Sequence, residues 1–423
     1  MGINFYVECV ACGLELGHRE PSLSCPKCGS QLVISYEYES IKEGVGRIFN
    51  GYLSTIWKYR PLLPLLKDEN IVSIGEGGTK LLRSSRLGRY IGVNNLLLKI
   101  EAWNPTGSHK DRQISVAISR GLELGYSVAI TSSSGNVGAS VAAYSSKASI
   151  QPLILVPNIA PEGKLLQIAM YGGIVIVVDT PSNVEVASIV KGVVERLKAY
   201  DTVTAASHNP YILEGGKTIA YEIYEQLGRL PDVVVVPVGG GGLVGSVWKG
   251  FKELEILGLV DRTELPKMVG VQAAGCAPFA KAVRENWGLE KILSEPWGEI
   301  KTICNAIADT IPLDARSALP AIKVSSGTVI EVTDEETLSA GYELSSMEGV
   351  FAEPSSSTTI AAVKKLRQEK FIDKDETILC VITGTGFKDL RSIKRIVPQF
   401  NVLPPKLEVV IEFLTNIIMK SAD

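Results

Sequence analysis

The chain has 423 residues, of which 45% are hydrophobic and 21% charged, and its formal net charge is −3. This composition predicts a soluble globular protein that is long enough for two sizeable domains. The lack of a basic excess argues against a nucleic-acid partner, and no apolar run approaches the roughly 18 residues of a membrane span. The N-terminus "MGINFYVECVACG" does not have the pattern of a signal peptide, so we expect a cytoplasmic protein with no membrane contact.

The N-terminal segment holds two Cys-x-x-Cys pairs, formed by Cys9, Cys12, Cys25 and Cys28. Four thiolates at this spacing are typical of a small zinc ribbon, in which they close a tetrahedral structural site. We therefore predict a zinc-ribbon-like appendage over residues 1–38. The alternative is a ribbon of reduced cysteines without metal. In either case the segment is not catalytic, because a site with four protein ligands has no open position.

From about residue 40 onward, strand-like and helix-like segments alternate. Apolar runs predict strands at 95–100, 127–133, 152–157, 173–179, 232–240, 267–275, 327–334 and 377–386. Helical periodicity predicts helices at 108–124, 135–148, 161–172 and 182–200. Repeated strand–helix units imply an α/β fold with doubly wound, mostly parallel open sheets. Ligands bind such sheets beyond the carboxyl ends of the strands, where the polar and glycine-rich stretches of this chain fall.

Three of these stretches have the composition of a binding site. "NPTGSHKDR" (104–112) sets Lys110 at a helix start, "TSSSGNVGAS" (131–140) joins a strand to a helix, and "PVGGGGLVG" (237–245) opens a helix after the most hydrophobic strand. Free backbone N–H groups at such helix starts bind anions. Each stretch alone has a simpler interpretation: a solvated lysine, a plain helix cap or a flexible connector. Their combination is far more specific than any one of them.

Together with "SIGEGGTKLL" (73–82) and "TGTGFKD" (383–389), these stretches resemble the fold-type-II pyridoxal-phosphate enzymes of the tryptophan synthase beta family, and most closely the threonine synthases. The resemblance covers nearly the whole chain. It implies a cofactor, pyridoxal 5′-phosphate, held between two open-sheet domains, and it implies a homodimer.

The expected domain organisation follows from the same resemblance. The large domain comprises residues 40–102 and 206–400, and carries the glycine-rich stretch. The small domain, residues 103–205, carries Lys110. A C-terminal helix lies within 401–423, and its apolar stripe either serves the dimer interface or packs on its own domain.

The resemblance also implies roles for individual residues. Lys110 matches the lysine that bonds covalently to the cofactor and then moves protons, and the positive end of its helix dipole disfavours its ammonium form. The residues implied to hold the cofactor are Lys110, Asn136 at the 3′-oxygen, Gly239, Gly240, Gly241, Gly242 and Leu243 at the phosphate, and Thr383 at the ring nitrogen. Those implied to bind the substrate carboxylate are Ser133, Ser134 and Gly135. Lys164 is a candidate for the substrate phosphate, with a structural role as its alternative.

The chain departs from the threonine synthase pattern at several positions. Val137 and Ala206 replace a threonine and an asparagine where the substrate phosphate would lie, and "GGGGL" is the form typical of dehydratases. A pocket that loses hydrogen-bond donors discriminates less well for an anion. His109 replaces a phenylalanine, as either a proton relay or a packing residue. Arg112 and Lys217 are further candidates for the substrate phosphate, with a structural role as the alternative for each.

Two enzymatic functions fit these residues. A threonine synthase would convert O-phosphohomoserine and water to threonine and phosphate. A threonine/serine dehydratase, or a β-replacement lyase for a serine or phosphoserine-like substrate, is the alternative that the departures favour. The whole-chain resemblance and the zinc-ribbon segment, which dehydratases generally lack, favour the first. A catalytically inactive homologue is a third interpretation, against which the retained Lys110 argues.

Overall fold

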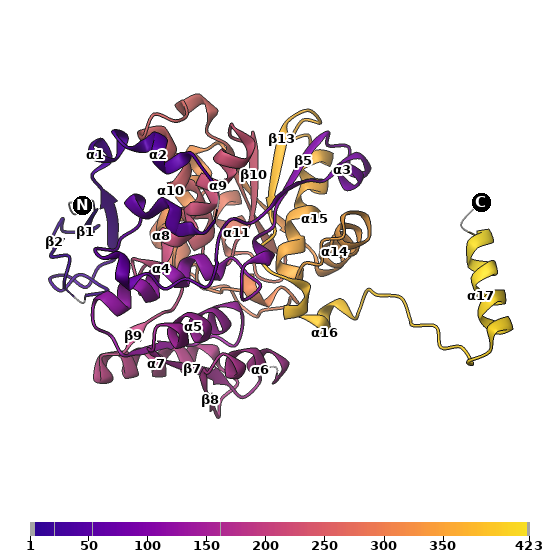
Figure 1. Cartoon of the computed structure of the whole chain (residues 1–423), viewed down its shortest axis with the longest axis horizontal. Helices are drawn as coiled ribbons and strands as arrows, with labels where there is room; N and C mark the ends of the chain where they lie inside the picture. Colours follow the sequence, from indigo (N-terminus) through magenta and orange to yellow (C-terminus); the bar gives the residue numbers. More distant parts are fainter. Residues whose placement is uncertain (1–4, 21, 53, 161, 421–423) are drawn as a thin grey trace.

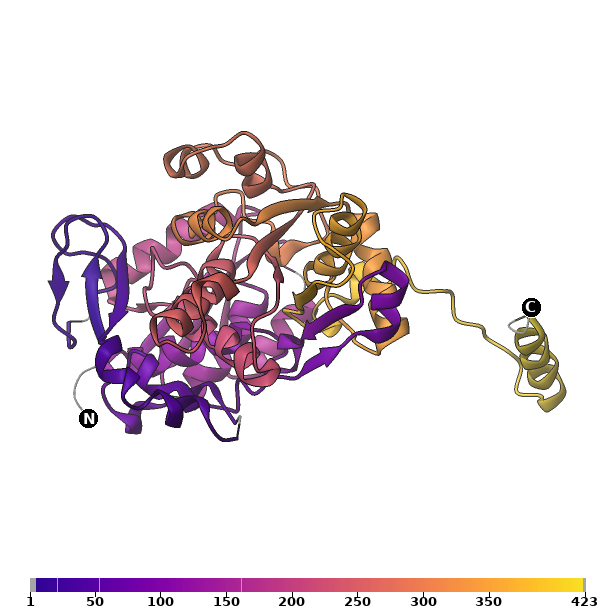
Figure 2. The ribbon, with the colours of Figure 1, turned by 90° about the horizontal axis from the view of Figure 1, so that it is seen from above.

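The structure is a computed structural model that describes residues 5–20, 22–52, 54–160 and 162–420. Its strands form a three-stranded, a six-stranded and a four-stranded sheet. Helices surround the two larger sheets, while the last helix stands apart from the body at the end of an extended segment (Figures 1 and 2). Within the described residues, no helix has the length and apolar character that crossing a membrane requires.

The three-stranded antiparallel sheet belongs to the cysteine-rich N-terminal segment. Its strands, in the order β2-β1-β3, are β1 (Phe5–Cys9), β2 (Glu15–Leu16) and β3 (Leu32–Tyr36). Alternate residues of β1 and β3, such as Val7 and Ile34, are buried in the same hydrophobic core as Tyr211 of the main body. Lys249 also donates a hydrogen bond to the Ile34 carbonyl at 2.7 Å. The segment is therefore packed against the main body, and its standing as a separate unit over residues 1–38 stays a prediction.

The connection to the main body is helical. It consists of α1 (Tyr38–Lys42), α2 (Val45–Phe49) and two 3-10 helices at Ile56–Leu62 and Asp68–Asn70.

The six-stranded sheet forms the centre of the larger part of the molecule. Its order is β12-β11-β10-β13-β5-β4. The strands are β4 (Leu81–Arg83), β5 (Asn95–Lys99), β10 (Val233–Pro237), β11 (Lys267–Ala273), β12 (Thr328–Val332) and β13 (Thr377–Val381). All neighbours are parallel except β4 and β5. Every residue of β10 is buried, as expected for a continuous apolar run in a parallel sheet.

Helices cover both faces of this sheet. The helices of this part of the molecule are α3 (Ser85–Ile91), α8 (Ile212–Gly216), α9 (Thr218–Leu227), α10 (Gly242–Ile256), α11 (Pro278–Arg284), α12 (Leu289–Ser294), α13 (Ala315–Val324), α14 (Asp334–Glu348), α15 (Pro354–Gln368) and α16 (Leu390–Ile393). Successive side chains of a strand point to opposite faces of the sheet, so they contribute to two separate layers of the core. Val234 packs in the layer that contains Leu254 of α10, and Val235 packs in the layer that contains Ile360 of α15.

The four-stranded sheet is parallel throughout and has the order β8-β7-β6-β9. Its strands are β6 (Val128–Thr131), β7 (Gln151–Pro157), β8 (Ile174–Val178) and β9 (Tyr200–Asp201). The helices of this part are α4 (Lys110–Glu123), α5 (Asn136–Lys147), α6 (Glu162–Met170) and α7 (Asn183–Leu197). Because α4 packs against both α5 and α8, it connects the two parts of the molecule.

The strands and helices predicted from the sequence are present, with small differences at their ends. The helix expected to reach residue 200 ends at Leu197, because Lys198 adopts the left-handed conformation with φ 52°. Strand β4 was not predicted, since three residues are too few to show a period. All four strands of the smaller sheet lie between residues 103 and 205, but the division into domains stays a prediction.

The C-terminal helix lies within the range predicted for it. It is α17 (Leu407–Lys420), and residues 401–406, with Pro404 and Pro405, are irregular. Parts of three predicted elements lie outside the described residues: 1–4 and 21 of the ribbon, 161 of a helix, and 421–423 of the C-terminal helix.

Candidate active site

The binding stretches follow the carboxyl ends of three strands, as parallel sheets predict. Strand β6 ends just before Ser133, β10 just before Gly239, and β13 just before Thr383. The lysine turn lies against the last of these, because the His109 N–H donates to the Thr383 carbonyl at 2.9 Å.

The turn before Lys110 is held by the residue that follows it. The Asp111 carboxylate accepts from the Thr106 N–H at 2.7 Å, from the Thr106 hydroxyl at 2.6 Å and from the Ser140 hydroxyl of α5 at 2.6 Å. Burial raises the pKa of Asp111 to about 6, against these hydrogen bonds, which lower it. An acidic residue in the first turn also complements the helix dipole. Asp111 thus fixes the direction in which Lys110 leaves the helix.

The Lys110 amine is only partly exposed, and it donates a hydrogen bond to the Thr204 hydroxyl at 3.1 Å. Desolvation lowers the pKa of Lys110, while the negative charges of Asp309, Asp314 and Glu353 raise it. A lowered pKa makes the neutral, nucleophilic amine more accessible. The amine can therefore bond to a carbonyl group and later accept protons.

The glycine-rich turn is a cup between β10 and α10. Gly241 has a φ of +103°, which only glycine adopts readily. A Cβ atom on Gly239 would lie 2.6 Å from Asp309 Oδ2, and one on Gly242 would lie 2.6 Å from Asp314 Oδ2. Side chains are thus excluded by the loop that carries the two aspartates. The Asp309 carboxylate accepts a hydrogen bond from the Gly240 N–H, so an anionic ligand of the N–H groups at the start of α10 would take its place.

This cup fits the phosphate of a cofactor. Its N–H groups lie at the positive end of the α10 dipole, and Gly239 and Gly240 are only half-buried. Asp314 is fixed there, since its N–H donates to the Gly240 carbonyl and its carboxylate accepts from the Ala206 N–H, both at 2.8 Å. Burial raises the pKa of Asp314 to about 7. Its protonated form would stand beside a phosphate without charge repulsion.

Asn136 begins α5 and faces the larger part of the molecule. Its amide donates to both carboxylate oxygens of Glu353, at 3.1 and 3.2 Å. Burial raises the pKa of Glu353 above its usual range, and the Asn136 hydrogen bond lowers it. Since a carboxylate only accepts, this contact fixes which end of the amide is the nitrogen. The second amide hydrogen can then serve the 3′-oxygen of a cofactor.

Thr383 lies at the end of β13 and is buried. Its hydroxyl is 2.8 Å from the Ser356 hydroxyl, which also bonds to the Gly384 backbone. The Thr383 hydroxyl can accept a hydrogen bond from Ser356 and donate its own hydrogen to a ring nitrogen. Such a nitrogen only accepts a hydrogen bond and stays unprotonated.

The serine loop and Lys164 line the same region. Ser133, Ser134 and Gly135 are half-buried at the start of α5, with the Gly135 N–H donating to the Ser133 hydroxyl at 3.3 Å. Lys164 on α6 is half-buried, and its charge contributes to the pKa of Glu353 by lowering it. It therefore lies near the Asn136 contact.

Arg112 and Lys217 lie away from the cup, in buried ion pairs. Arg112 bonds to Glu101 and Glu222 at 2.7 and 2.6 Å, and all three side chains are fully buried. Lys217 bonds to Glu214 at 2.8 Å and to Glu253 at 2.9 Å. Both cations are already neutralised, so the structural alternative holds for them.

His109 is buried beside Lys110. Burial and the positive charge of Lys110 hold the pKa of His109 well below its usual range. Its Nδ1 lies 3.4 Å from the Thr383 carbonyl. A neutral imidazole in this position supports the packing interpretation over the proton relay.

Sequence reasoning did not find several residues of the site. Glu353 and Ser356 lie in "EGVFAEPSSS", which has family-like text but no residue whose role the sequence reveals. Thr204, Asp309 and Asp314 lie in irregular loops, and no sequence signal marks them.

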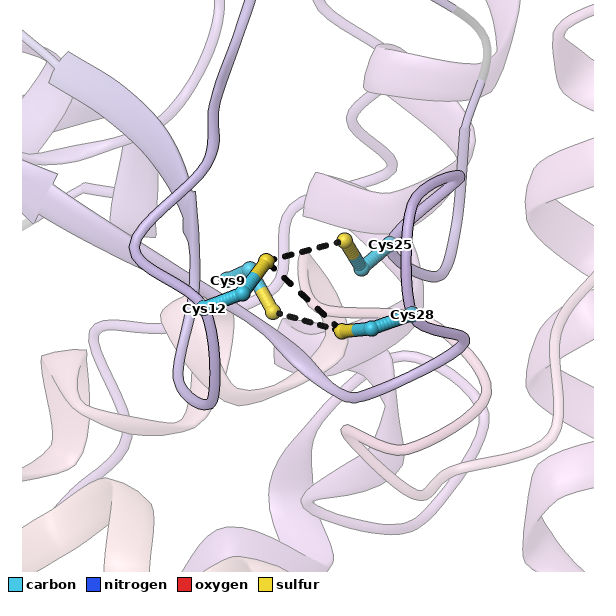
Figure 3. A group of neighbouring side chains, drawn as sticks. All are labelled: Cys9, Cys12, Cys25 and Cys28. Atoms are coloured by element: carbon cyan, nitrogen blue, oxygen red, sulfur yellow. Dashed lines mark hydrogen bonds between the residues drawn. The ribbon is translucent and has the colours of Figure 1, made fainter.

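The four cysteines lie far from these residues in the chain and form a separate cluster (Figure 3). Their sulfur atoms all lie within 4.8 Å of one another, with separations of 3.5 Å for Cys9–Cys28 and 3.7 Å for Cys12–Cys25 and Cys12–Cys28. Tetrahedral zinc with Zn–S bonds of about 2.3 Å requires sulfur separations of about 3.8 Å. The cluster therefore fits a zinc ion.

Comparison with known proteins agrees with this site. Residues 72–384 match the family of pyridoxal-phosphate-dependent enzymes. The threonine synthase of Methanocaldococcus jannaschii is 41% identical over 90% of this chain and 92% of its own length. That of Methanosarcina acetivorans is 37% identical over 96% of this chain and 98% of its own length.

Solved structures show the same fold at lower identity. Maize serine racemase is 20% identical with a TM-score of 0.62, covering 82% of this chain and 94% of its own. O-ureido-L-serine synthase is 17% identical with a TM-score of 0.63, covering 76% and 94%. The lysine turn, the glycine cup and the match over 72–384 thus have one explanation: the chain belongs to the pyridoxal-phosphate-dependent enzymes, and within them to the threonine synthase family.

Proposed function

We propose that the protein is a lyase that acts as a threonine synthase, converting O-phosphohomoserine and water to threonine and phosphate with pyridoxal 5′-phosphate. The observation that carries this proposal is identity of 41% with a threonine synthase over 90% of the chain. The position of Lys110 among the cup, Asn136 and Thr383 supports it.

The residues that would hold the cofactor come from the cup, the start of α5 and the end of β13. Backbone N–H groups of Gly239–Leu243 would hold the cofactor phosphate, the Asn136 amide would donate to its 3′-oxygen, and the Thr383 hydroxyl would bond to its ring nitrogen. When bound, the cofactor supplies an electron sink for charge that develops at the substrate α-carbon. A hydroxyl at the ring nitrogen, in place of a carboxylate, suits elimination and replacement better than transamination.

Lys110 then acts on the substrate as a base and an acid. Its lowered pKa lets the neutral amine accept the α-proton, pass that proton on, and then accept a β-proton, so that it carries only one of them at a time. It returns a proton to carbon after phosphate has left and water has added. The hydroxyls and N–H groups of Ser133, Ser134 and Gly135 hold the substrate carboxylate, and Lys164 holds its phosphate. This arrangement orients the α-proton toward Lys110.

A dehydratase or β-replacement activity is the second candidate, and Ala206 and Val137 favour it. Ala206 is 2% exposed and Val137 is half-buried, so neither offers a side-chain donor to a substrate phosphate. A site without those donors loses less binding free energy for a substrate with an uncharged hydroxyl group than for a substrate with a phosphate.

Four finer properties are also proposals. We expect one zinc ion on Cys9, Cys12, Cys25 and Cys28, in keeping with their sulfur separations. We also expect a homodimer, as the family resemblance implies, and a cytoplasmic location. A place in threonine biosynthesis is in keeping with the names of the threonine synthase relatives.

The two activities are distinguished by their products. The purified, cofactor-loaded protein should release phosphate and threonine in equal amounts from O-phosphohomoserine, and should form no 2-oxobutanoate from threonine. Formation of 2-oxobutanoate from threonine, without phosphate release from O-phosphohomoserine, would instead identify a dehydratase.

A further inference from the structure

The C-terminal helix α17 presents an apolar face to solvent. Its sequence, LEVVIEFLTNIIMK, is mostly apolar. Leu407, Ile411, Leu414 and Ile418 recur at helical spacing, so they share one face, and they are 68%, 53%, 49% and 66% exposed. A face of this kind is normally covered by protein.

The segment that carries α17 is also apolar and extended. Residues 398–406 contain Pro398, Pro404 and Pro405, and the side chains of Phe400 and Val402 are 91% and 90% exposed. Proline favours extended, semi-rigid backbone, which holds the helix at a distance. Figures 1 and 2 agree that α17 stands away from the body at the end of this segment. We call residues 398–420 the C-terminal arm.

The body has an apolar groove where this arm begins. The groove, of about 280 Å³, lies between α14, the start of α15 and the turn after α16. We call it the α14–α16 groove; its apolar wall consists of Leu338, Tyr342, Phe351, Ile393, Ile396 and Val397. Tyr342, Ile396 and Val397 are 47%, 37% and 40% exposed, so the groove opens to the surface.

Charges on the two surfaces are complementary. Glu408 and Glu412 lie on α17, away from its apolar stripe. Exposed cations lie on α16 and the turn that follows it, beside the groove: Arg391, Lys394 and Arg395. An acidic amphipathic helix in an apolar groove with a basic rim is a recurrent mode of recognition.

From these observations we propose that the C-terminal arm docks into the α14–α16 groove of a second copy of this chain. Val397 is both a wall of the groove and the residue at which the arm leaves it. To reach its own groove, α17 would have to turn back within the nine proline-containing residues 398–406. A second copy needs no such reversal, and a two-fold exchange forms the same contact twice. The inference deepens the proposed homodimer by assigning its interface.

The test uses variants of the full chain in sedimentation equilibrium. Leu414→Glu on the arm and Tyr342→Glu in the groove should each weaken the dimer about 30-fold or more, because each places a charge in an apolar contact. Asn416→Glu, on the opposite face of α17, is the matched control and should leave the dimer intact. An equimolar mixture of the arm and groove variants should recover part of the dimer, since the mixed pair keeps one unaltered arm and one unaltered groove.

Every other outcome overturns the inference in a recognisable way. A wild-type protein that is monomeric would remove the dimer itself and indicate docking in its own groove or on another partner. A dimer that persists in both variants would place the interface elsewhere. Dissociation by Leu414→Glu alone, with Tyr342→Glu still dimeric, would indicate pairing between two copies of α17.

Discussion

Three carboxylates from distant parts of the chain, Asp309, Asp314 and Glu353, lie around Lys110, and each raises its pKa against the effect of burial. The pKa of Lys110 is therefore lowered by burial against the effect of these three charges, a shift that favours its use as a base. Asp309 is exposed in the structure, whereas Asp314 and Glu353 are buried. An anion in the glycine cup would add a fourth negative charge on the same side.

Replacement of Lys110 by alanine is the most direct test of its role. The variant should lose all turnover and the visible absorbance of the bound cofactor, because no other amine takes its place. Borohydride treatment of the wild type should fix the cofactor on the peptide that contains Lys110, as mass spectrometry would show. Labelling of Lys164 or Lys217 instead would mean that the lysine turn has been misassigned.

The protonation of Asp314 should appear in the stability of the cofactor-free protein. Its pKa is raised from an ordinary value near 4 to about 7, so the folded state binds this proton more tightly than the unfolded state. The contribution of this bound proton to the free energy of unfolding is complete below pH ~4 and is lost as the pH rises through about 7. The melting temperature of the wild type should therefore fall over this range by calorimetry. Asp314→Asn should flatten the decline and Asp373→Asn should not; equal slopes in all three proteins would contradict the assignment.

At the scale of elements, what the sequence predicts depends on whether a segment is periodic. Strand β10 was predictable because a continuous apolar run is typical of a strand buried on both faces, and all of its residues are indeed buried. Helix α4 was predictable because its apolar residues recur at helical spacing. The loop with Asp309 and Asp314 was not, because irregular segments have no period and their partners are distant in the chain. Motif resemblance predicts roles for Lys110 and the cup, but it could not predict Glu353 as the hydrogen-bond partner of Asn136.

The ribbon offers a prediction about metal at the same scale. Its strands share the core of the main body, and the Tyr36 hydroxyl donates to Glu214 at 2.7 Å. Loss of the metal should therefore lower the stability of the main body as well as that of the ribbon. The wild type should contain one zinc ion per chain by plasma emission spectroscopy. Cys12→Ser should lose the zinc and melt at a lower temperature, while Cys276→Ser, in a buried thiol outside the cluster, should keep it. If the wild type contains no zinc although zinc was present throughout its preparation, the alternative of a ribbon of reduced cysteines without metal would be supported.

At the scale of the whole molecule, the polar contacts around Lys110 join the part with the four-stranded sheet to the part with the six-stranded sheet, in addition to the packing of α4. His109 reaches the Thr383 carbonyl, Asn136 reaches Glu353, and the Lys388 amine donates to Gln167 on α6 at 2.6 Å. We propose that residues 103–205 move as a unit, so that closure on the substrate excludes water from the reacting atoms.

Lys388 is the contact whose removal tests this motion best. Burial lowers its pKa, while Glu353 and Asp111 raise it, so the charge is held between acidic groups from both parts. Lys388→Met keeps the length of the side chain and removes the hydrogen bond to Gln167. We expect KM for O-phosphohomoserine to rise about threefold to tenfold, the range that loss of one charged hydrogen bond would give with partial compensation. Amide hydrogen exchange in α6 should quicken in the same variant, which a purely local effect on binding would not produce. Lys147→Met, an exposed site on α5, should change neither quantity, and unaltered exchange in α6 of Lys388→Met would show that this contact does not hold the two parts together.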